Sequence, residues 1–290
     1  MKNEALIRLA REQFHKQLVD DFVLTIDANG IPSNADAGNK PSCAIAAGIA
    51  NQLGALRHEK LKAQSAGKFF ECAVSEFVEK VFPNLQHLRP GRWSVLNLGN
   101  QSETKTSAFA QYEHLSYLAK VLEKDARLSS MIGNDYMVAP DIVVSRELCD
   151  DEEINSRQIV VDADTSLMAD LRKSNGGKPL LHASISAKWT MRSDRAQNSR
   201  TEALNLIRNR KGHLPHIVVV TGEPLPSRLA SLALGTGDLD CIYHFALNEL
   251  HEAVKEYSRA GREDILEQLE SLIDGKRLKD ISDLPLDLAC

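Results

Sequence analysis

Five short apolar segments in the second half of the chain constrain its fold more than any other feature. They read VAPDIVVS (138–145), QIVVD (158–162), LLHASISAKWT (180–190), HIVVVT (216–221) and DCIYHFA (240–246). Short runs that are rich in β-branched residues predict β-strands. Patterns of 3.6-residue period between several of them predict helices. Strands interleaved with helices in this way indicate an α/β fold built on a mixed sheet.

The rest of the chain is predicted to be mainly helical. Apolar spacing predicts helices at 3–20, 44–63, 68–82, 108–125, 194–210, 247–259 and 263–273, with a short one after Pro226. A further short strand is predicted near RWSVLNLG (92–99). Neither an internal repeat nor a dividing linker is found. We therefore expect one α/β domain spanning 1–290, with a central mixed β-sheet flanked by helices and a helical N-terminal half packed on an α/β core at about 135–250.

Positive charge is concentrated in one region of an acidic chain. The net charge is −5, yet residues 188–213 carry seven lysines and arginines against two acidic residues. A basic island on an acidic protein is expected where one surface meets phosphate groups. A solvated helix face is the simpler alternative.

The cysteines and the N-terminus indicate the compartment. The five cysteines are odd in number and include no Cys-x-x-Cys pair, which argues against a disulfide framework and a structural zinc site. The N-terminus lacks the apolar core of a signal peptide, and no apolar run is long enough to span a membrane. We therefore expect a soluble intracellular protein with free thiols and no membrane partner.

An aspartate and a lysine stand on two of the predicted strands. Alternation along 180–190 places on one apolar face Leu181, Ala183, Ile185, Ala187 and Trp189. Ser186 and Lys188 share the opposite, polar face, where a lysine often serves solubility alone. Asp141 follows Pro140 at the start of another apolar strand. Metal-dependent nucleases use an acid and a lysine placed in this way, because the carboxylate holds Mg²⁺ while the lysine lies near the scissile phosphate.

The second carboxylate of that arrangement is missing from its usual position. It normally lies two residues before the lysine, where this chain has Ser186. Glu202, about one helix downstream, could reach back to the strand end. Glu71 falls on the apolar stripe of the helix predicted at 68–82, where a carboxylate is costly unless it is paired, hydrogen-bonded or near a metal. An ordinary ion pair is the alternative interpretation for Glu71.

A group of ionic residues follows the strand that carries Lys188. The sequence RSDR supplies Arg192, Asp194 and Arg195 at the start of a predicted helix. An arginine can bridge guanine O6 and N7 in the major groove, and an aspartate can accept a hydrogen bond from cytosine N4. These side chains could therefore read neighbouring G·C pairs. Such residues are common at helix starts, so the interpretation depends on their closeness to Lys188.

Together these residues resemble the active site of a known enzyme family. PD at 140–141, SAK at 186–188, Glu202 and RSDRAQN at 192–198 are similar to the motifs of the tetrameric type II restriction endonucleases, which are PD-(D/E)xK-superfamily enzymes with a displaced acidic residue. The strings LRPGRW (88–93), RNRKGHLPHIVVVT (208–221) and ALGTGDLDCIYHFAL (233–247) extend the resemblance over nearly the whole chain. Residues 1–12 and 101–107 match poorly.

The resemblance implies a restriction-endonuclease-like fold and a role for each matching residue. Asp141, Glu71 and the backbone carbonyl of Ala187 would bind two Mg²⁺ ions, and the catalytic set would be completed by Lys188, Glu202 and Ser186. The inner G·C pairs would be contacted by Arg192, Asp194 and Arg195, the outer pairs by Asp36 and Arg228, and the minor groove by Gln64. Ala187 stands where the family has a cysteine, a harmless change if only the carbonyl is a ligand.

It also implies a substrate and an assembly. The target would be GCCGGC in double-stranded DNA, cut after the first G to leave 5′-phosphate ends. The enzyme would act in a prokaryotic cytoplasm as a homotetramer of two back-to-back dimers, with a cognate DNA methyltransferase encoded with it. Two other functions stay open. One is a structure-specific nuclease of DNA repair or recombination, and the other is a DNA-binding protein that does not cut.

Overall fold

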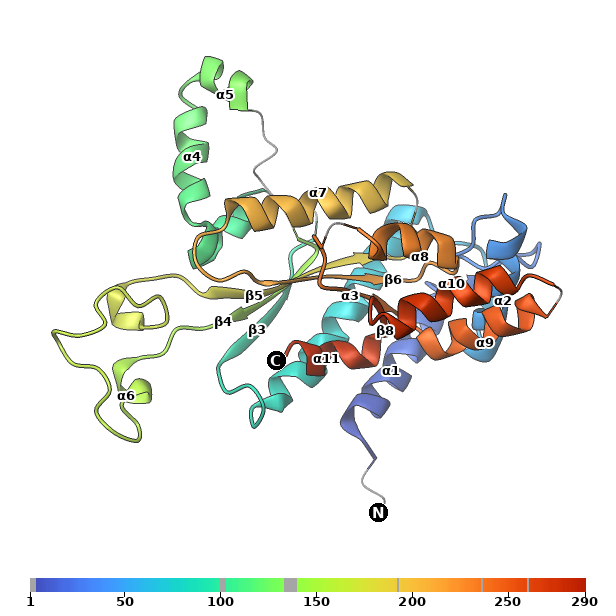
Figure 1. The fold of residues 1–290 in the computed structure, drawn as a ribbon, viewed down its shortest axis with the longest axis horizontal. Coiled ribbons are helices and arrows are strands. Elements are labelled where there is room, and N and C mark those ends of the chain that lie inside the picture. The colour runs from blue at the N-terminus through green and yellow to red at the C-terminus, as the bar shows by residue number, and fades with distance from the viewer. Residues whose placement is uncertain (1–3, 100–102, 133–139, 192, 236, 260) are drawn as a thin grey trace.

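The computed structural model describes residues 4–99, 103–132, 140–191, 193–235, 237–259 and 261–290. Figure 1 shows a central sheet with helices on both sides and two extensions that leave this body. One extension carries α4 (His114–Leu122) and α5 (Ala126–Ile132), and the other carries α6 (Asp151–Ile154). Among the helices of the described ranges, none combines the length and the apolar composition needed to cross a bilayer.

Most of the remaining elements lie in segments that periodicity indicated, but of the helix predicted at 108–125 only His114–Leu122 is α-helical. The other α-helices are α1 (Leu6–Asp20), α2 (Lys40–Gln52), α3 (Ala63–Val81), α7 (Ser193–Asn209), α8 (Pro226–Ala233), α9 (Leu247–Ser258), α10 (Glu263–Asp274) and α11 (Leu284–Asp287). The strands are β1 (Thr25–Ile26), β2 (Leu56–Arg57), β3 (Trp93–Asn97), β4 (Ile142–Arg146), β5 (Leu180–Lys188), β6 (His216–Thr221), β7 (Cys241–His244) and β8 (Leu278–Asp280). Short 3₁₀ turns are η1 (Phe82–Leu85), η2 (Glu103–Ala108), η3 (Ala110–Tyr112), η4 (Lys173–Asn175) and η5 (Ile281–Asp283).

Six strands form one mixed sheet in the order β3-β4-β5-β6-β7-β8. β3, β4 and β5 are antiparallel to one another, whereas β5 to β8 are parallel. Parallel neighbours need crossover connections, which α7, α8 and the pair α9–α10 provide. The predicted α/β class, with a mixed sheet flanked by helices, is confirmed. The sheet is wider than expected, because β3 joins it from the first half and β8 was not predicted.

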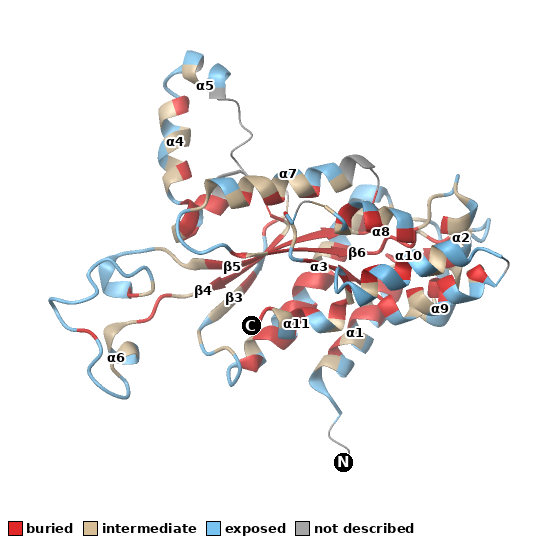
Figure 2. Cartoon of the chain, viewed as in Figure 1, coloured by how far each residue is buried: buried red, intermediate tan, exposed pale blue. Residues whose placement is uncertain are grey.

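Both faces of the sheet are covered. On one face, α1, α2 and α3 share an apolar cluster with the strands, which includes Phe70 of α3 and Ile185 of β5. On the other face, η3, α4 and α7 pack over Val143 and Ile217. Figure 2 shows the strands buried along most of their length and the extension around α6 mostly exposed. Of the β5 residues, only Leu180, His182 and Lys188 are partly exposed, and Lys188 is the one at the C-terminal end of the strand.

Strand β5 departs from strict alternation at His182. The pairing register with β4 shifts there, so that His182 has no partner residue in β4. Such a β-bulge reverses the face of the residues that precede it. Leu181 consequently packs on the α7 side, while His182 stacks on Phe82 with ring centroids 5.6 Å apart. The prediction of one shared face is wrong for Leu181 and confirmed for Ala183 and Ile185.

The segment QIVVD (158–162) does not form the predicted strand. It lies in the long connection between β4 and β5, where Ile159 is 85% exposed. The side-chain oxygen of Asn155 accepts hydrogen bonds from the backbone nitrogens of Val160 at 2.8 Å and Val161 at 3.0 Å. Because these donors are used locally, they are not available to a strand ladder.

The helix predicted at 44–63 begins and ends earlier than expected. α2 starts at Lys40, where Asn39 caps it through its side-chain oxygen. Near its end, Gly54 has a φ of +69° and the nitrogen of Ala55 donates to the carbonyl of Ala50 at 2.8 Å. This is the Schellman pattern, in which a glycine terminates a helix. The residues that follow form β2 and lead to α3.

Candidate active site

Asp141 and Lys188 meet where β4 begins and β5 ends. The two strands are antiparallel and Ile142 pairs with Ile185, so the start of β4 lies beside the end of β5. One carboxylate oxygen of Asp141, Oδ2, accepts hydrogen bonds from Lys188 Nζ at 2.8 Å and from the backbone nitrogen of Ala187 at 2.9 Å. Ser186 Oγ lies 3.4 Å from the same oxygen. Val138 and Ala139, which were predicted to begin this strand, lie outside the described residues.

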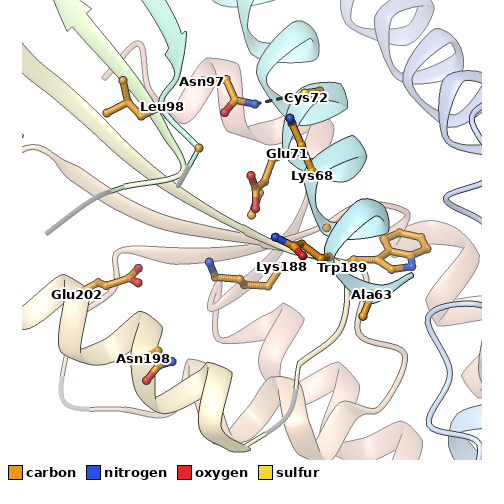
Figure 3. Close-up of a pocket in the computed structure, with 14 residues that line it drawn as sticks. Ala63, Lys68, Glu71, Cys72, Asn97, Leu98, Lys188, Trp189, Asn198 and Glu202 are labelled. Carbon is orange, nitrogen blue, oxygen red and sulfur yellow. Dashed lines mark hydrogen bonds between the residues drawn. The ribbon is translucent and has the colours of Figure 1, made fainter. Parts of the chain in front are cut away.

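A cavity of about 730 Å³ opens beside this contact. Its lining includes Lys188 from β5, Glu71 from α3 and Glu202 from α7. Figure 3 shows these three side chains directed toward the same space. Because α3 and α7 cover opposite faces of the sheet, their glutamates can approach one another only beyond the strand end. The two candidates for the displaced carboxylate therefore face one cavity.

The environment of Lys188 keeps its amine positively charged. Burial alone lowers the pKa of Lys188, but the hydrogen-bonded carboxylate of Asp141, together with Glu202 and Glu71, raises it above the ordinary value. A charged amine at this point can bind a phosphate oxygen. It is poorly suited to accept a proton from water.

The two glutamates carry carboxyl groups that are unusually easy to protonate. Burial, followed by the charge of Asp141, raises the pKa of Glu71 to about 7, although Lys188 and Lys68 oppose the shift. Burial also raises the pKa of Glu202, against the effect of Lys188 and with that of Asp141. Carboxylates that share a partly buried space repel one another, and a bound cation relieves that repulsion.

The donor chemistry of this cavity fits a magnesium ion. Within the described residues, no three acidic, histidine or cysteine side chains converge closely enough to hold a metal by themselves. Mg²⁺ seldom needs such a cage, since it usually takes one or two carboxylates and completes its octahedron with water and substrate phosphate oxygens. Oxygen donors of this kind are present in Asp141, Glu71 and the carbonyl of Ala187. A divalent cation would stabilise the ionised form of Glu71, which burial and the charge of Asp141 disfavour.

The residues predicted to read the inner base pairs are only partly described. Arg192 lies outside the described residues. Asp194 and Arg195 belong to the first turn of α7, and their side chains also lie outside what the structure describes. Gln64, predicted to approach the minor groove, is in the first turn of α3 and lines the same cavity as Lys188.

Asp36 and Arg228, predicted to read the outer pairs, lie together. Asp36 is in the loop before α2 and forms an ion pair through Oδ2 with Nη2 of Arg228 in α8. The other terminal nitrogen of Arg228, Nη1, lies 3.5 Å from Oε2 of Glu223. Burial disfavours the charge of Arg228, but the two acids hold its pKa above the ordinary value.

Several residues of the site carried no prediction from the sequence. Lys68, Asn97 and Asn198 line the cavity. Spacing could have indicated two of them, because Lys68 precedes Glu71 and Asn198 precedes Glu202 by about one helical turn, which places each pair on one face. Glu223 had no such signal, since the TGEP sequence around it reads as an ordinary turn.

Comparison with known proteins shows the family of the chain. Residues 14–290 match the family described as NgoMIV restriction enzyme. The chain is 51% identical over 280 residues to the type II restriction enzyme NgoMIV of Neisseria gonorrhoeae, across 96% of this chain and 97% of that relative. Similarity of this extent reaches from α1 to the C-terminus and confirms the expected restriction-endonuclease-like fold. The chain therefore belongs to the NgoMIV restriction enzyme family.

Proposed function

We propose that this type II restriction endonuclease cuts both strands of DNA at GCCGGC, after the first G, in a reaction that needs Mg²⁺. The observation that carries the proposal is the contact of Asp141 with Lys188 at the mouth of a cavity that Glu71 and Glu202 also enter. Lysine, aspartate and displaced glutamates at the end of two antiparallel strands are suited to hydrolysis of a phosphodiester. The products carry 5′-phosphate and 3′-hydroxyl ends.

In this proposal each side chain has a separate task. Asp141, Glu71 and the Ala187 carbonyl hold up to two magnesium ions, which when bound supply a water of lowered pKa and neutralise charge on the phosphate. The charged amine of Lys188 binds an oxygen of the scissile phosphate. Glu202 replaces the carboxylate that Ser186 does not provide, and Ser186 supports Asp141 through its hydroxyl.

Recognition is assigned to residues at the starts of α7, α8 and α3 and in the loop before α2. Arg192, Asp194 and Arg195 contact the inner G·C pairs from the start of α7, and Gln64 approaches through the minor groove. Asp36 and Arg228 contact the outer pairs. Their ion pair in the free protein supports this assignment, because it orients a fork of N–H donors that matches guanine O6 and N7.

The enzyme is further proposed to be a homotetramer, a dimer of dimers, in the cytoplasm of a prokaryote. A two-fold dimer reads a palindrome naturally. The extension around α6 supports a further contact, because it exposes Ile159 (85%), Leu167 (54%) and Met168 (91%). Exposed apolar side chains on an extension that leaves the body of the molecule are suited to contact with another subunit. A cognate DNA methyltransferase would protect the host's own sites. Within each subunit, the whole chain would act as one domain.

A plasmid digest with Mg²⁺ tests the activity. Discrete fragments that end at GCCGGC are expected. A smear would indicate a structure-specific repair nuclease, and retention of DNA without cutting would indicate a protein that only binds. Either result would refute the proposal.

Asp141→Ala separates binding from cutting. The variant is expected to bind the GCCGGC duplex and to leave it uncut, because the base-reading residues are intact while a metal ligand is lost. Asp20→Ala is the matched control, since it removes the same charge from the exposed end of α1. Undiminished cleavage by Asp141→Ala would contradict the assignment of the active site.

A further inference from the structure

Glu223 is a buried carboxylate that the cutting chemistry does not use. It lies in the turn between β6 and α8, and its side chain is 0% exposed. Oε2 accepts a hydrogen bond from the backbone nitrogen of Met191 at 3.0 Å, and Oε1 accepts one from that of Leu225 at 3.1 Å. Burial raises the pKa of Glu223, whereas these amides and Arg228 oppose the shift. A charge buried this deeply persists only where its partners are held in place.

The partners of Glu223 belong to the segments that would read the DNA sequence. Met191 directly precedes Arg192 in the chain, and α7 begins at Ser193. Leu225 is the N-cap residue of α8, and Arg228 lies in the first turn of that helix. One carboxylate thus joins the backbone that leads into α7 to the start of α8.

Arg228 is held between a buried acid and an accessible one. Its Nη1 faces Glu223, whose side chain is fully buried, and its Nη2 pairs with Asp36, whose side chain is 36% exposed. A base edge could compete for the exposed side of the guanidinium but could not reach the buried side. Glu223 therefore keeps the plane of the guanidinium oriented even when the contact with Asp36 is exchanged for DNA.

The backbone that carries Glu223 is itself tightly fixed. Thr221 Oγ1 and the nitrogen of Gly222 both donate to the carbonyl of Lys188, at 2.8 Å and 3.2 Å. A Cβ on Gly222 would lie 2.6 Å from the ring of Trp189, so the turn passes β5 at a distance that only glycine allows. The turn is therefore bonded to the residue that carries the catalytic amine.

We propose that Glu223 is a positioning residue for sequence recognition, which holds Arg228 and the backbone leading into α7 in a single arrangement. The inference rests on the proposed function, because it takes Arg228 and the start of α7 as the base readers. An arginine that is already oriented loses less freedom when it binds. Loss of Glu223 should therefore weaken discrimination between sequences more than it weakens contact with the DNA backbone.

The experiment compares Glu223→Gln with Asp280→Asn. Asp280 is a matched control: it is 5% exposed, accepts a hydrogen bond from the nitrogen of Leu247 and pairs with Arg11, and these partners do not line the cavity. Binding is measured with Ca²⁺ in place of Mg²⁺, to a duplex with GCCGGC, to duplexes with the outer or the inner pair exchanged, and to an unrelated duplex. Thermal midpoints are recorded for each protein.

Glu223→Gln is expected to lower the preference for GCCGGC over the duplex with exchanged outer pairs by about tenfold, as for one lost base contact. Affinity for the unrelated duplex should stay within about twofold, because phosphate contacts supply non-specific binding. Asp280→Asn should lower the thermal midpoint and leave the preference unchanged. In cleavage, Glu223→Gln should raise the KM for GCCGGC more than it lowers kcat.

The proposal is overturned if Glu223→Gln folds and discriminates as well as the unsubstituted protein, or if Asp280→Asn loses the same preference. Should Glu223→Gln fail to fold, Glu223→Asp takes its place, because it keeps the charge and withdraws the oxygens by one methylene. An unchanged preference in Glu223→Asp would then refute the inference. If the unsubstituted enzyme itself shows no preference for GCCGGC, the proposed function fails instead.

Discussion

Replacing Gly222 with alanine tests how firmly the end of β5 is held. A Cβ at this position would lie 2.6 Å from Cε3 of the Trp189 ring and 2.7 Å from the Trp189 carbonyl oxygen. The ring cannot turn away freely, because it is 3% exposed and packs against Phe70 at 5.1 Å and Phe245 at 5.2 Å between centroids. The strain must therefore move the end of β5, where Lys188 lies, or the turn after β6, which is hydrogen-bonded to the carbonyl of Lys188.

The expected cost follows from this geometry. Overpacking a well-filled core costs about 1 to 3 kcal/mol, and the enclosed Trp189 puts Gly222→Ala near the upper end, at about 2 to 3 kcal/mol. Displacement of Lys188 by a fraction of an ångström should also lower kcat, by about tenfold or more. Urea unfolding monitored by tryptophan fluorescence and cleavage of a GCCGGC plasmid measure the two effects.

A second glycine gives the matched control. A Cβ at Gly177 would meet its nearest neighbours at 3.6 Å, which is ordinary contact. Gly177→Ala is therefore expected to change the free energy of unfolding by less than about 0.5 kcal/mol and to cut normally. Equal stabilities for the two alanine variants would show that the end of β5 is not fixed by Trp189, and the reasoning would fail.

Three further outcomes are expected. Arg195→Ala should weaken binding to GCCGGC by about 1 to 3 kcal/mol and leave binding to unrelated DNA nearly unchanged, and a uniform loss in a binding titration would contradict its part in base reading. Burial lowers the pKa of His182 and of His244 to about 4. At these two histidines the unfolded chain thus binds more protons between pH 4 and 6.5, so their contribution to stability should fall as pH falls through this window. At pH 5 each histidine should cost about 1 to 2 kcal/mol, and a pH series of urea unfolding that gives the same slope for His244→Asn would refute this. Met168→Glu should break the proposed tetramer into dimers, and an unchanged mass in light scattering would exclude that residue from the interface.

Local pattern predicted most elements of the fold, and it failed where tertiary contacts decided the outcome. β6 is a short continuous apolar run rich in β-branched residues, which favours a buried strand of a parallel sheet, and its bounds agree with the prediction. QIVVD has a similar composition, yet Asn155 holds its backbone donors in a loop. The bulge at His182 was also not predictable from the sequence pattern, because it arises from the register between β4 and β5 and not from either strand alone.

The residues of the candidate site likewise follow in part from the sequence and in part from the tertiary structure. A lysine two residues after Ser186 and an aspartate after a proline indicated the site from residue type and spacing alone. Glu71 and Glu202 were left as alternatives, because spacing along the chain does not show which helix covers which face. The structure directs both into one cavity, where α3 supplies Glu71 and α7 supplies Glu202 beside Lys188.

The sequence by itself determined where the strands and helices form, which residue types could bind metal and phosphate, and which family the chain resembles. Periodicity and residue chemistry are local properties and can be read one segment at a time. Only the tertiary structure decided that Asp36 pairs with Arg228 and that Glu223 joins Met191 to Arg228. These partners are 192, 32 and 5 residues apart, and the first two pairs meet only when the packed sheet and its helices bring distant segments together.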